Sequence, residues 1–267
     1  MKKYILLFIC AVIFGLTSCE ELKEELGLKD PDKDQNDNKE DQKPPQNVNK
    51  SPCAYFTFDG NYEDLSGTGK NAYGNPEPTF VNGPTTGKKA IAFSRANNTK
   101  VVVNDGLIDS PSMTLSFWLK DISEGDICYV TTSNNSKMMS LAYKNGHLKY
   151  VMTRDHVRYS YNQYGDFTHK AIDDGDWHHI VLVSDFNTLT PNAVTLFLYV
   201  DGVLMDTLTE GYSASSENDQ SNRHFGAGTK FVMGGDNTPN MKIANLRVYD
   251  EWQLPESEIK NLYTKKL

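Results

Sequence analysis

The chain lacks the features that mark several large classes of protein. No apolar run among its 267 residues reaches the roughly 18 that a membrane-spanning helix needs. Its four cysteines are too few for a disulfide-built scaffold. The 27 basic side chains are outnumbered by 35 acidic ones. This balance argues against nucleic acid as the main partner, because phosphate binding needs a basic stripe. Neither a Gly-x-x-x-x-Gly-Lys phosphate loop nor a Gly-x-Ser-x-Gly nucleophile turn occurs.

Residues 1–18 have the pattern of a signal peptide. Lys2 and Lys3 precede a thirteen-residue apolar stretch, residues 4–16, which is too short to cross a bilayer. The stretch leads into Leu-Thr-Ser before Cys19, and this order resembles the lipobox of bacterial lipoproteins. The resemblance implies that Cys19 becomes the acylated N-terminus and holds the protein on a lipid membrane. The alternative is an ordinary signal peptide that contains a cysteine.

Residues 19–52 are predicted to be the lipidated N-terminus and a disordered acidic tether. Residues 20–52 contain ten Asp or Glu against six Lys, together with four Pro. They contain too little apolar surface to offset the entropy lost on ordering. The acidic run after Cys19 is similar to export signals of lipoproteins that reach the cell surface. We therefore expect a domain anchored to the bacterial outer membrane and displayed at the cell surface, with a periplasmic domain as the alternative.

Residues 53–267 are predicted to form one all-β domain, a two-sheet antiparallel jelly-roll sandwich with a short C-terminal helix. Period-two patterns of β-forming residues indicate the strands. Asn145-Gly146 and Asp201-Gly202 predict two tight hairpin turns. Pro255 is typical of a first helical position. The expected strands are residues 54–58, 89–93, 100–104, 112–120, 127–132, 139–144, 147–153, 157–161, 178–184, 194–200, 203–209, 230–233 and 242–249.

Several motifs in this domain appear in an order that resembles a known family. They are AYFTFDG at 54–60, DLSGTG at 64–69, MTLSFWLK at 113–120, WHHIVLV at 177–183, LYVDG at 198–202, IANLRVY at 243–249 and LPESEI at 254–259. Together they are similar to the laminin-G-like, concanavalin-A-like jelly-roll domains. The resemblance covers residues 54–265 and implies two antiparallel sheets packed face to face.

The sequence offers little catalytic chemistry. Glycan hydrolysis, which some relatives perform, needs two carboxylates flanking the scissile bond. Residues i and i+2 of a strand share a face, so a Glu-x-Asp-x-Glu run would supply the pair, but none occurs. The acidic run at 173–176 is interpreted as a turn. His178 and His179 are adjacent on a predicted strand, point to opposite faces, and so cannot both ligate one metal ion. We therefore expect no enzyme activity.

Two questions stay open at this level. Laminin-G-like domains often bind calcium, so the resemblance implies a structural Ca²⁺ near Asp59 or Asp64. The alternative for Asp64 is a side-chain cap on the turn at residues 66–67. Cys53 and Cys128 remain after processing, and they either form a disulfide in an oxidising compartment or stay as buried thiols.

Sugar rings bind on aromatic faces, with a few polar groups to fix their orientation. Two segments offer such side chains. One segment, expected to run from a strand into a polar loop, carries Tyr161, Tyr164 and Phe167, although Tyr161 could instead pack within its sheet. The other is the long polar segment 211–228, which carries Tyr212, Arg223 and Phe225.

The leading hypothesis is a membrane-anchored module that binds a glycan or glycoprotein. The alternative is a protein–protein adhesion or assembly module that uses a sheet face or edge. A glycoside hydrolase is the least supported of the three readings, because the sequence supplies no carboxylate pair.

Overall fold

The structure is a computed structural model that describes residues 51–110, 112–156, 159–167, 171–186, 193–211, 228–235 and 237–266. The side chains of residues 152–167, 210 and 211 lie outside this description. All described residues fall within one compact unit, residues 42–267. The predicted signal peptide, Cys19 and almost all of the tether therefore lie outside the described residues.

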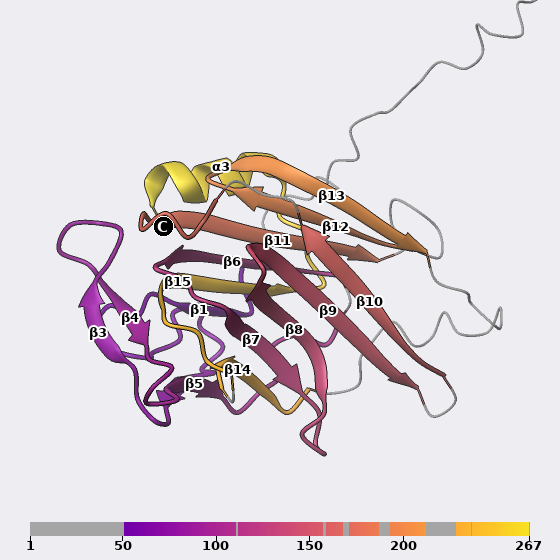
Figure 1. The fold of residues 1–267 in the computed structure, drawn as a ribbon, viewed down its shortest axis with the longest axis horizontal. Helices are drawn as coiled ribbons and strands as arrows, with labels where there is room; N and C mark the ends of the chain where they lie inside the picture. Colours follow the sequence, from indigo (N-terminus) through magenta and orange to yellow (C-terminus); the bar gives the residue numbers. More distant parts are fainter. Residues whose placement is uncertain are drawn as a thin grey trace, which may run out of the picture. The chain divides into compact units, whose positions relative to one another are not determined.

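Two antiparallel sheets form this unit (Figure 1). Sheet A has the strand order β13-β12-β11-β6-β15-β4-β3, and β1 pairs with β15 beside this path. Its strands are β1 (Ala54–Phe56), β3 (Thr79–Asn82), β4 (Lys89–Phe93), β6 (Met113–Lys120), β11 (His178–Phe186), β12 (Ala193–Val200), β13 (Val203–Gly211) and β15 (Met241–Asp250).

Sheet B has the order β10-β9-β8-β7-β14-β5-β2. Its strands are β2 (Ala72–Gly74), β5 (Lys100–Val103), β7 (Gly125–Thr131), β8 (Lys137–Lys144), β9 (His147–His156), β10 (Tyr159–Phe167) and β14 (Lys230–Gly234). Each sheet combines consecutive strands with neighbours that are distant in sequence, such as β6 with β15 and β7 with β14. Both sheets therefore depend in part on long-range pairing. The predicted all-β sandwich is confirmed.

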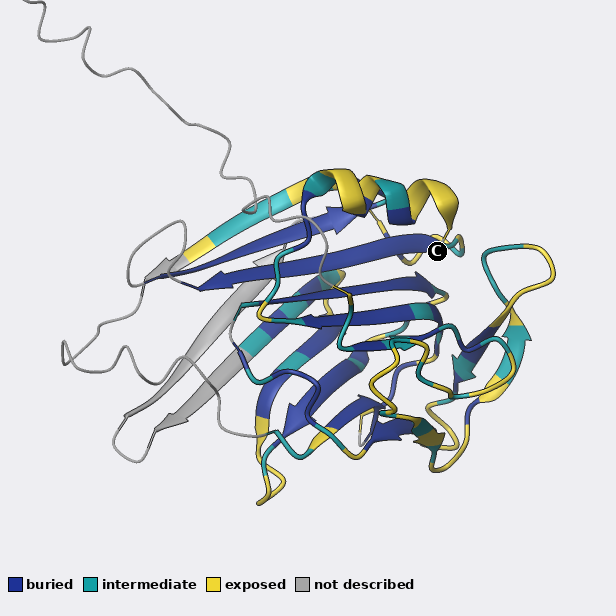
Figure 2. Ribbon diagram, turned by 180° about the vertical axis from the view of Figure 1, so that it is seen from behind, coloured by how far each residue is buried: buried dark blue, intermediate teal, exposed yellow. Residues whose placement is uncertain are grey.

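The main hydrophobic core is built from the inner faces of the two sheets. Along β6, Leu115, Phe117 and Leu119 belong to this core, while Ser116 and Trp118 lie on the opposite face. Phe231 and Tyr150 contribute large, almost fully buried rings from sheet B. Each fully buried apolar side chain contributes roughly 1.5–3 kcal/mol of transfer free energy. Figure 2 shows the resulting concentration of buried residues in the strands.

The two predicted hairpin turns are confirmed by their backbone angles. Asn145 and Gly146 have φ of 54° and 78°, and Asp201 and Gly202 have φ of 55° and 75°. Positive φ at both central residues gives a turn whose twist matches the flanking strands. These turns fix the registers of β8 with β9 and of β12 with β13.

Helix α3 (Glu256–Lys265) packs against the outer face of sheet A (Figure 1). Ile259 and Leu262 are its buried residues, and they join a second apolar cluster with Val181 and Phe197 of the sheet. The described residues include no helix over the outer face of sheet B. None of the described helices has the length and hydropathy needed to cross a membrane.

The sequence-based strand assignment was wrong in two places. Strands β2 and β3 were missed, because segments of only three and four residues carry too little periodic signal. The region after residue 156 was expected to end as a strand at 161 and continue as a polar loop. Instead, β10 extends from Tyr159 to Phe167 and pairs with β9 along its whole length. An edge strand tolerates the polar composition that suggested a loop.

His178 and His179 lie in different surroundings, as their alternation on β11 predicts. His178 bridges Asp174 and Asp201, with a distance of 2.9 Å to each carboxylate. His179 is fully buried on the outer face, where its Nε2 lies 2.9 Å from Ser116 Oγ and its ring packs against Trp118. Burial, reinforced by the charge of Arg247, lowers the pKa of His179 from 6.5 to about 4.

This lowered pKa predicts a loss of stability in mild acid. The unfolded chain takes up a proton on His179 below pH 6.5, whereas the folded protein does not until about pH 4. The contribution of His179 to the free energy of unfolding is therefore complete above pH 6.5, and it falls by about 3 kcal/mol as the pH drops to 4. Urea unfolding of His179→Gln across this range should show a shallower slope than the unsubstituted protein. His147→Gln, at a half-buried position, is the control, and equal slopes for His179→Gln and unsubstituted protein would refute the assignment.

Candidate functional site

The outer face of sheet B carries a continuous cross-strand row of residues. The row begins at Tyr73 on β2, passes through Tyr129 on β7 and ends at Tyr164 on β10. Each member is the register partner of the next: Tyr73, Val102, Val232, Tyr129, Ser140, Val151 and Tyr164. We call this set the tyrosine row. From Tyr73 to Val151, these residues occupy the face opposite the core, because core residues such as Val101, Phe231 and Tyr150 alternate with them.

The three tyrosine positions are evenly spaced across the sheet. Three strand steps separate Tyr73 from Tyr129, and three more separate Tyr129 from Tyr164. Each interval is about 14 Å at the ordinary spacing between strands. Such a row suits an extended ligand that runs across the strands.

The aromatic rings of the row differ in how open they are. Tyr73 is 41% exposed, and its hydroxyl donates to Asn104 Oδ1 at 3.3 Å. Tyr129 is only 8% exposed, and Lys137 Nζ lies over its ring at 4.4 Å from the centroid. Lys137 is also ion-paired with Asp126 at 2.7 Å. Tyr73 therefore presents an open ring, whereas Tyr129 is covered by a lysine that a ligand could draw away.

Gly235 is required beside Tyr129. It has φ of 114°, and a Cβ at this position would lie 2.5 Å from the Tyr129 hydroxyl. The backbone at the end of β14 can approach the ring only because no side chain intervenes. This contact fixes the outer edge of the Tyr129 ring.

The backbone register of β10 with β9 is what the structure gives for the predicted ligand residues on β10. Tyr164 pairs with the outward position Val151 and belongs to the tyrosine row. Tyr161 and Phe167 pair with Arg154 and Leu148, in register with the core-facing positions of β9. Tyr164 and the other two residues therefore occupy alternate register positions of β10, and the side chains of all three lie outside the described residues. The second predicted segment, with Tyr212, Arg223 and Phe225, lies outside the described residues.

The sequence did not single out Tyr73 or Tyr129. The hydrophobic alternation along β7 placed Tyr129 within a strand, but no local signal distinguished its outward position from a core position. Tyr73 lies in the three-residue strand β2, which sequence reasoning missed.

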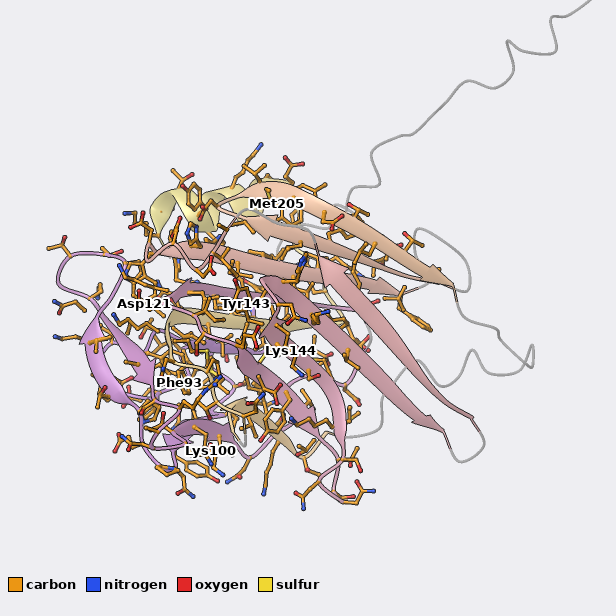
Figure 3. The ribbon with its side chains drawn as sticks, viewed as in Figure 1. Phe93, Lys100, Asp121, Tyr143, Lys144 and Met205 are labelled. Atoms are coloured by element: carbon orange, nitrogen blue, oxygen red, sulfur yellow. The ribbon has the colours of Figure 1, made fainter. Side chains whose placement is uncertain are left out.

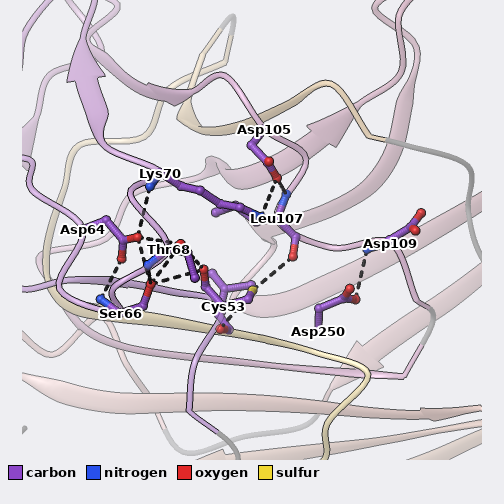
Figure 4. Close-up of polar contacts among 10 residues, drawn as sticks. Cys53, Asp64, Ser66, Thr68, Lys70, Asp105, Leu107, Asp109 and Asp250 are labelled. Carbon is purple, nitrogen blue, oxygen red and sulfur yellow. Dashed lines mark hydrogen bonds and ion pairs between the residues drawn. The ribbon is translucent and has the colours of Figure 1, made fainter.

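Asp64 acts as a hydrogen-bond hub for the loop that follows β1 (Figure 4). Its Oδ1 accepts the backbone N–H groups of Tyr55 and Ser66, each at 2.9 Å. Its Oδ2 accepts the hydroxyls of Ser66 and Thr68 at 2.8 and 2.7 Å, and the N–H of Lys70 at 3.2 Å. Partial burial would raise the pKa of Asp64, but these bonds outweigh it and lower the pKa to about 2. Asp64 thus caps the turn that the sequence suggested as one reading.

The candidate calcium ligands do not form a coordination shell. Both oxygens of Asp64 are occupied by N–H and O–H donors, which a cation would have to displace. Asp59 accepts the N–H of Lys89 at 2.9 Å and forms an ion pair with Lys88 at 2.9 Å. No group of three His, Cys, Asp or Glu side chains within the described part of the chain is arranged to hold a metal ion. The residues present here do not fit the Ca²⁺ site that the resemblance implied.

Cys53 and Cys128 are both free thiols. The Cys53 Sγ donates to the carbonyl oxygens of Leu107 and Val248, at 3.2 and 3.3 Å. Cys128 is buried in the main core on β7. Burial raises the pKa of Cys53 to about 11 and that of Cys128 to about 12. Neither thiol has the character of a reactive nucleophile.

Carboxylates are scarce among the described side chains on the outer face of sheet B. Among its strand positions with described side chains, Asp126 is the one acidic residue, and it is ion-paired with Lys137. A pair of carboxylates flanking a glycosidic bond is the requirement for hydrolysis. The described strand positions of this face supply one member of such a pair, Asp126.

Comparison with known proteins identifies the fold. A family model described as the concanavalin A-like lectin/glucanases superfamily matches residues 95–260. The resemblance drawn from the sequence motifs is confirmed over this range. No curated protein matches the chain.

Solved structures share the fold at low sequence identity. Domain 4 of AbnA, a GH43 extracellular arabinanase from Geobacillus stearothermophilus, was solved with arabinotriose. It matches with a TM-score of 0.57 and 18% identity, over 80% of this chain and 98% of that one. The binding domain of Paraclostridial Mosquitocidal Protein 1 matches with a TM-score of 0.57 and 17% identity, over 76% and 49%. The binding domain of botulinum neurotoxin DC, solved with rat synaptotagmin II, matches with a TM-score of 0.57 and 14% identity, over 82% and 53%. The chain spans about half the length of the two toxin domains, and identities this low show the fold alone.

The Asp64 hub predicts a specific pattern of stability. Asp64→Asn removes the charge that five donors share and turns an amide donor toward some of them, so the free energy of unfolding should fall by about 2 kcal/mol. Chemical denaturation measures this loss. Glu63→Gln, an exposed neighbour, should change stability by less than about 0.5 kcal/mol. Millimolar Ca²⁺ or a chelator should leave the midpoint of thermal unfolding unchanged, and a midpoint raised by Ca²⁺ would contradict the account.

Proposed function

We propose that this chain, which belongs to the concanavalin A-like lectin/glucanases superfamily, is a binding module for a glycan or glycoprotein. The tyrosine row on the outer face of sheet B is the single observation that carries this proposal. Sugar rings present apolar C–H faces that stack on aromatic rings, while side-chain amides, hydroxyls and charges fix their orientation. Tyr73, with its open ring and its bonded Asn104, offers both kinds of contact.

The solved structures with this fold are consistent with a binding role. Domain 4 of the arabinanase was solved with an oligosaccharide, and it matches this chain over almost its full length. Both toxin matches are named as binding domains, and one was solved with a protein partner. A glycoprotein ligand would offer both an oligosaccharide and a protein surface for contact.

A protein–protein adhesion module is the second candidate, and the toxin domain solved with synaptotagmin II is the observation that favours it. Such a module would bind its partner through side chains of the same face, without a need for an open aromatic ring. A glycoside hydrolase is disfavoured, because the described strand positions of this face supply Asp126 alone.

The membrane anchor completes the proposed function. Leu-Thr-Ser before Cys19 supports acylation at that cysteine, and the acidic tether supports display at the outer surface of a bacterial outer membrane. Residues 20–52, fully stretched, reach at most about 110 Å, which suffices to hold the domain clear of the lipid. A domain on such a tether would meet polymers outside the cell.

The tyrosine row predicts which aromatic substitutions weaken binding. A glycan array first identifies the ligand, and binding to no glycan together with capture of a protein partner would favour the adhesion module. Tyr73→Ala and Tyr164→Ala should then each weaken the affinity by about 1 kcal/mol or more, measured by titration calorimetry. Tyr263→Ala, which removes a comparably exposed tyrosine from α3, should leave the affinity unchanged. Unchanged affinity in both row variants would discard this placement of the site.

The anchor has its own test. Intact mass of the protein purified from membranes should show a diacylglycerol thioether and fatty acyl chains on a chain that begins at Cys19. Cys19→Ser should abolish the lipid mass and release the protein from the membrane fraction. Cys10→Ser, within the predicted signal peptide, is the control and should leave both unchanged. Lipid-free Cys19 in the unsubstituted protein would contradict the anchor.

A further inference from the structure

Lysine side chains surround the tyrosine row on the outer face of sheet B. The strand positions of this face with described side chains include five lysines against the single carboxylate of Asp126. The lysines are Lys100 on β5, Lys137 and Lys144 on β8, Lys149 on β9 and Lys230 on β14. Each is assigned to this face by alternation with core neighbours or, for Lys137, by its contact with Tyr129. Figure 3 labels Lys100 and Lys144.

These lysines lie on both sides of the tyrosine row. Lys100 precedes Val102 by two residues and Lys230 precedes Val232 by two, and β5 and β14 are antiparallel. Lys100 and Lys230 therefore extend to opposite sides of the row. Lys144 lies four residues beyond Ser140, further along β8. A ligand lying along the row would have ammonium groups on both flanks.

The described strand side chains of this face carry a charge opposite to that of the domain. Residues 53–267 contain 19 basic and 25 acidic side chains, for a net charge of −6. The excess of lysine among these described positions is not explained by composition. It concentrates positive potential where the open ring of Tyr73 is found.

Three of these lysines form no ion pair with a described residue. Lys100, Lys144 and Lys230 have no carboxylate within the 4.0 Å that defines a salt bridge among the described side chains. Lys144 and Lys230 are exposed, and Lys100 is half-buried. Lys137 is paired with Asp126, but it lies across Tyr129 and is 41% exposed, so an incoming anion can compete for it.

We propose that the ligand of this face is an anionic polysaccharide, with carboxylate or sulfate groups that pair with Lys100, Lys144 and Lys230. This inference rests on the proposed function and names its substrate class. Sugar rings contact Tyr73 and the neighbouring row, while the acidic substituents on either side of the chain meet the flanking lysines. A ligand anion also takes Lys137 from Asp126 and uncovers the Tyr129 ring.

A polysaccharide fits this face better than a nucleic acid. Nucleic-acid sites present a dense basic surface that releases many counterions, whereas the net charge of this domain is −6. The face holds a few lysines spaced around tyrosines. This low density of positive charge matches a polymer that carries one negative charge per sugar or fewer. Lysine, with a single compact ammonium group, pairs with carboxylate and sulfate oxygens without fixed geometry.

The test compares matched polymers that differ only in charge. Titration calorimetry of the full-length protein uses polygalacturonate and its carboxyl-reduced form, and dextran sulfate and dextran. We expect binding to at least one acidic member and at least tenfold weaker binding to its neutral partner. Raising the salt concentration should weaken the acidic interaction. The two pairs distinguish carboxylate from sulfate as the recognised group.

Substitutions then test whether the lysines of this face bind the anionic groups of the ligand. Lys100→Ala, Lys144→Ala and Lys230→Ala should each weaken acidic binding about threefold, and the triple variant about twentyfold or more. Asp126→Asn should strengthen it about threefold, because Lys137 is released to the ligand. Lys265→Ala, on α3, is the matched control and should leave the affinity unchanged. Circular dichroism confirms that each variant is folded.

Two results would overturn the inference while leaving the proposed function intact. They are equal affinity for the charged and neutral members of both pairs, and undiminished acidic binding by the triple variant. If duplex DNA bound as tightly as the acidic polysaccharides, the interaction would be a nonspecific binding of polyanions, and the inference would be wrong. Binding to no glycan of any charge would overturn the proposed function as well.

Discussion

The alternation of side chains between the two faces of each strand is the constraint on which the rest of this structure depends. It directs one face of each sheet into the shared core, where Phe117 and Phe231 are buried, and leaves each sheet with a second face. The second face of sheet A carries an apolar cluster that packs against α3 through Ile259 and Leu262. The second face of sheet B carries tyrosines and lysines instead, and no described helix covers it. The same backbone rule therefore produces both the stable sandwich and the surface that we assign to binding.

The candidate site is a product of strand register rather than of any local motif. Tyr73, Tyr129 and Tyr164 are far apart in the sequence, and six consecutive cross-strand pairings bring their positions into one row. A one-residue slip in any of these pairings would move a tyrosine to the core side of its strand. Strand alternation also places the lysines on this face, because core residues alternate with them along each strand. Rigid strands hold such positions more firmly than loops do.

Local chemistry in the sequence predicted much of the fold. Asn-Gly and Asp-Gly specified two hairpins, and long alternating runs such as β6 and β12 were found almost to their bounds, because both signals are local. The short strands β2 and β3 were missed because three or four residues carry too little periodic signal. The polar edge strand β10 was partly taken for a loop, because its pairing with β9 defines it and its composition does not. The sequence could propose oxygen ligands at Asp64 but could not show that backbone N–H groups already occupy its oxygens. The cross-strand partners of Tyr164 and Phe167 also follow from the pairing of β10 with β9, which the sequence did not show.

The central claim is that the outer face of sheet B binds an extended, negatively charged glycan. A crystal structure of the protein with an acidic oligosaccharide that it retains tests this claim most directly. The account predicts sugar rings against Tyr73 and along the tyrosine row, with anionic groups within hydrogen-bonding distance of Lys100, Lys144 or Lys230. An oligosaccharide bound on the outer face of sheet A, or held only by residues 211–228, would contradict it.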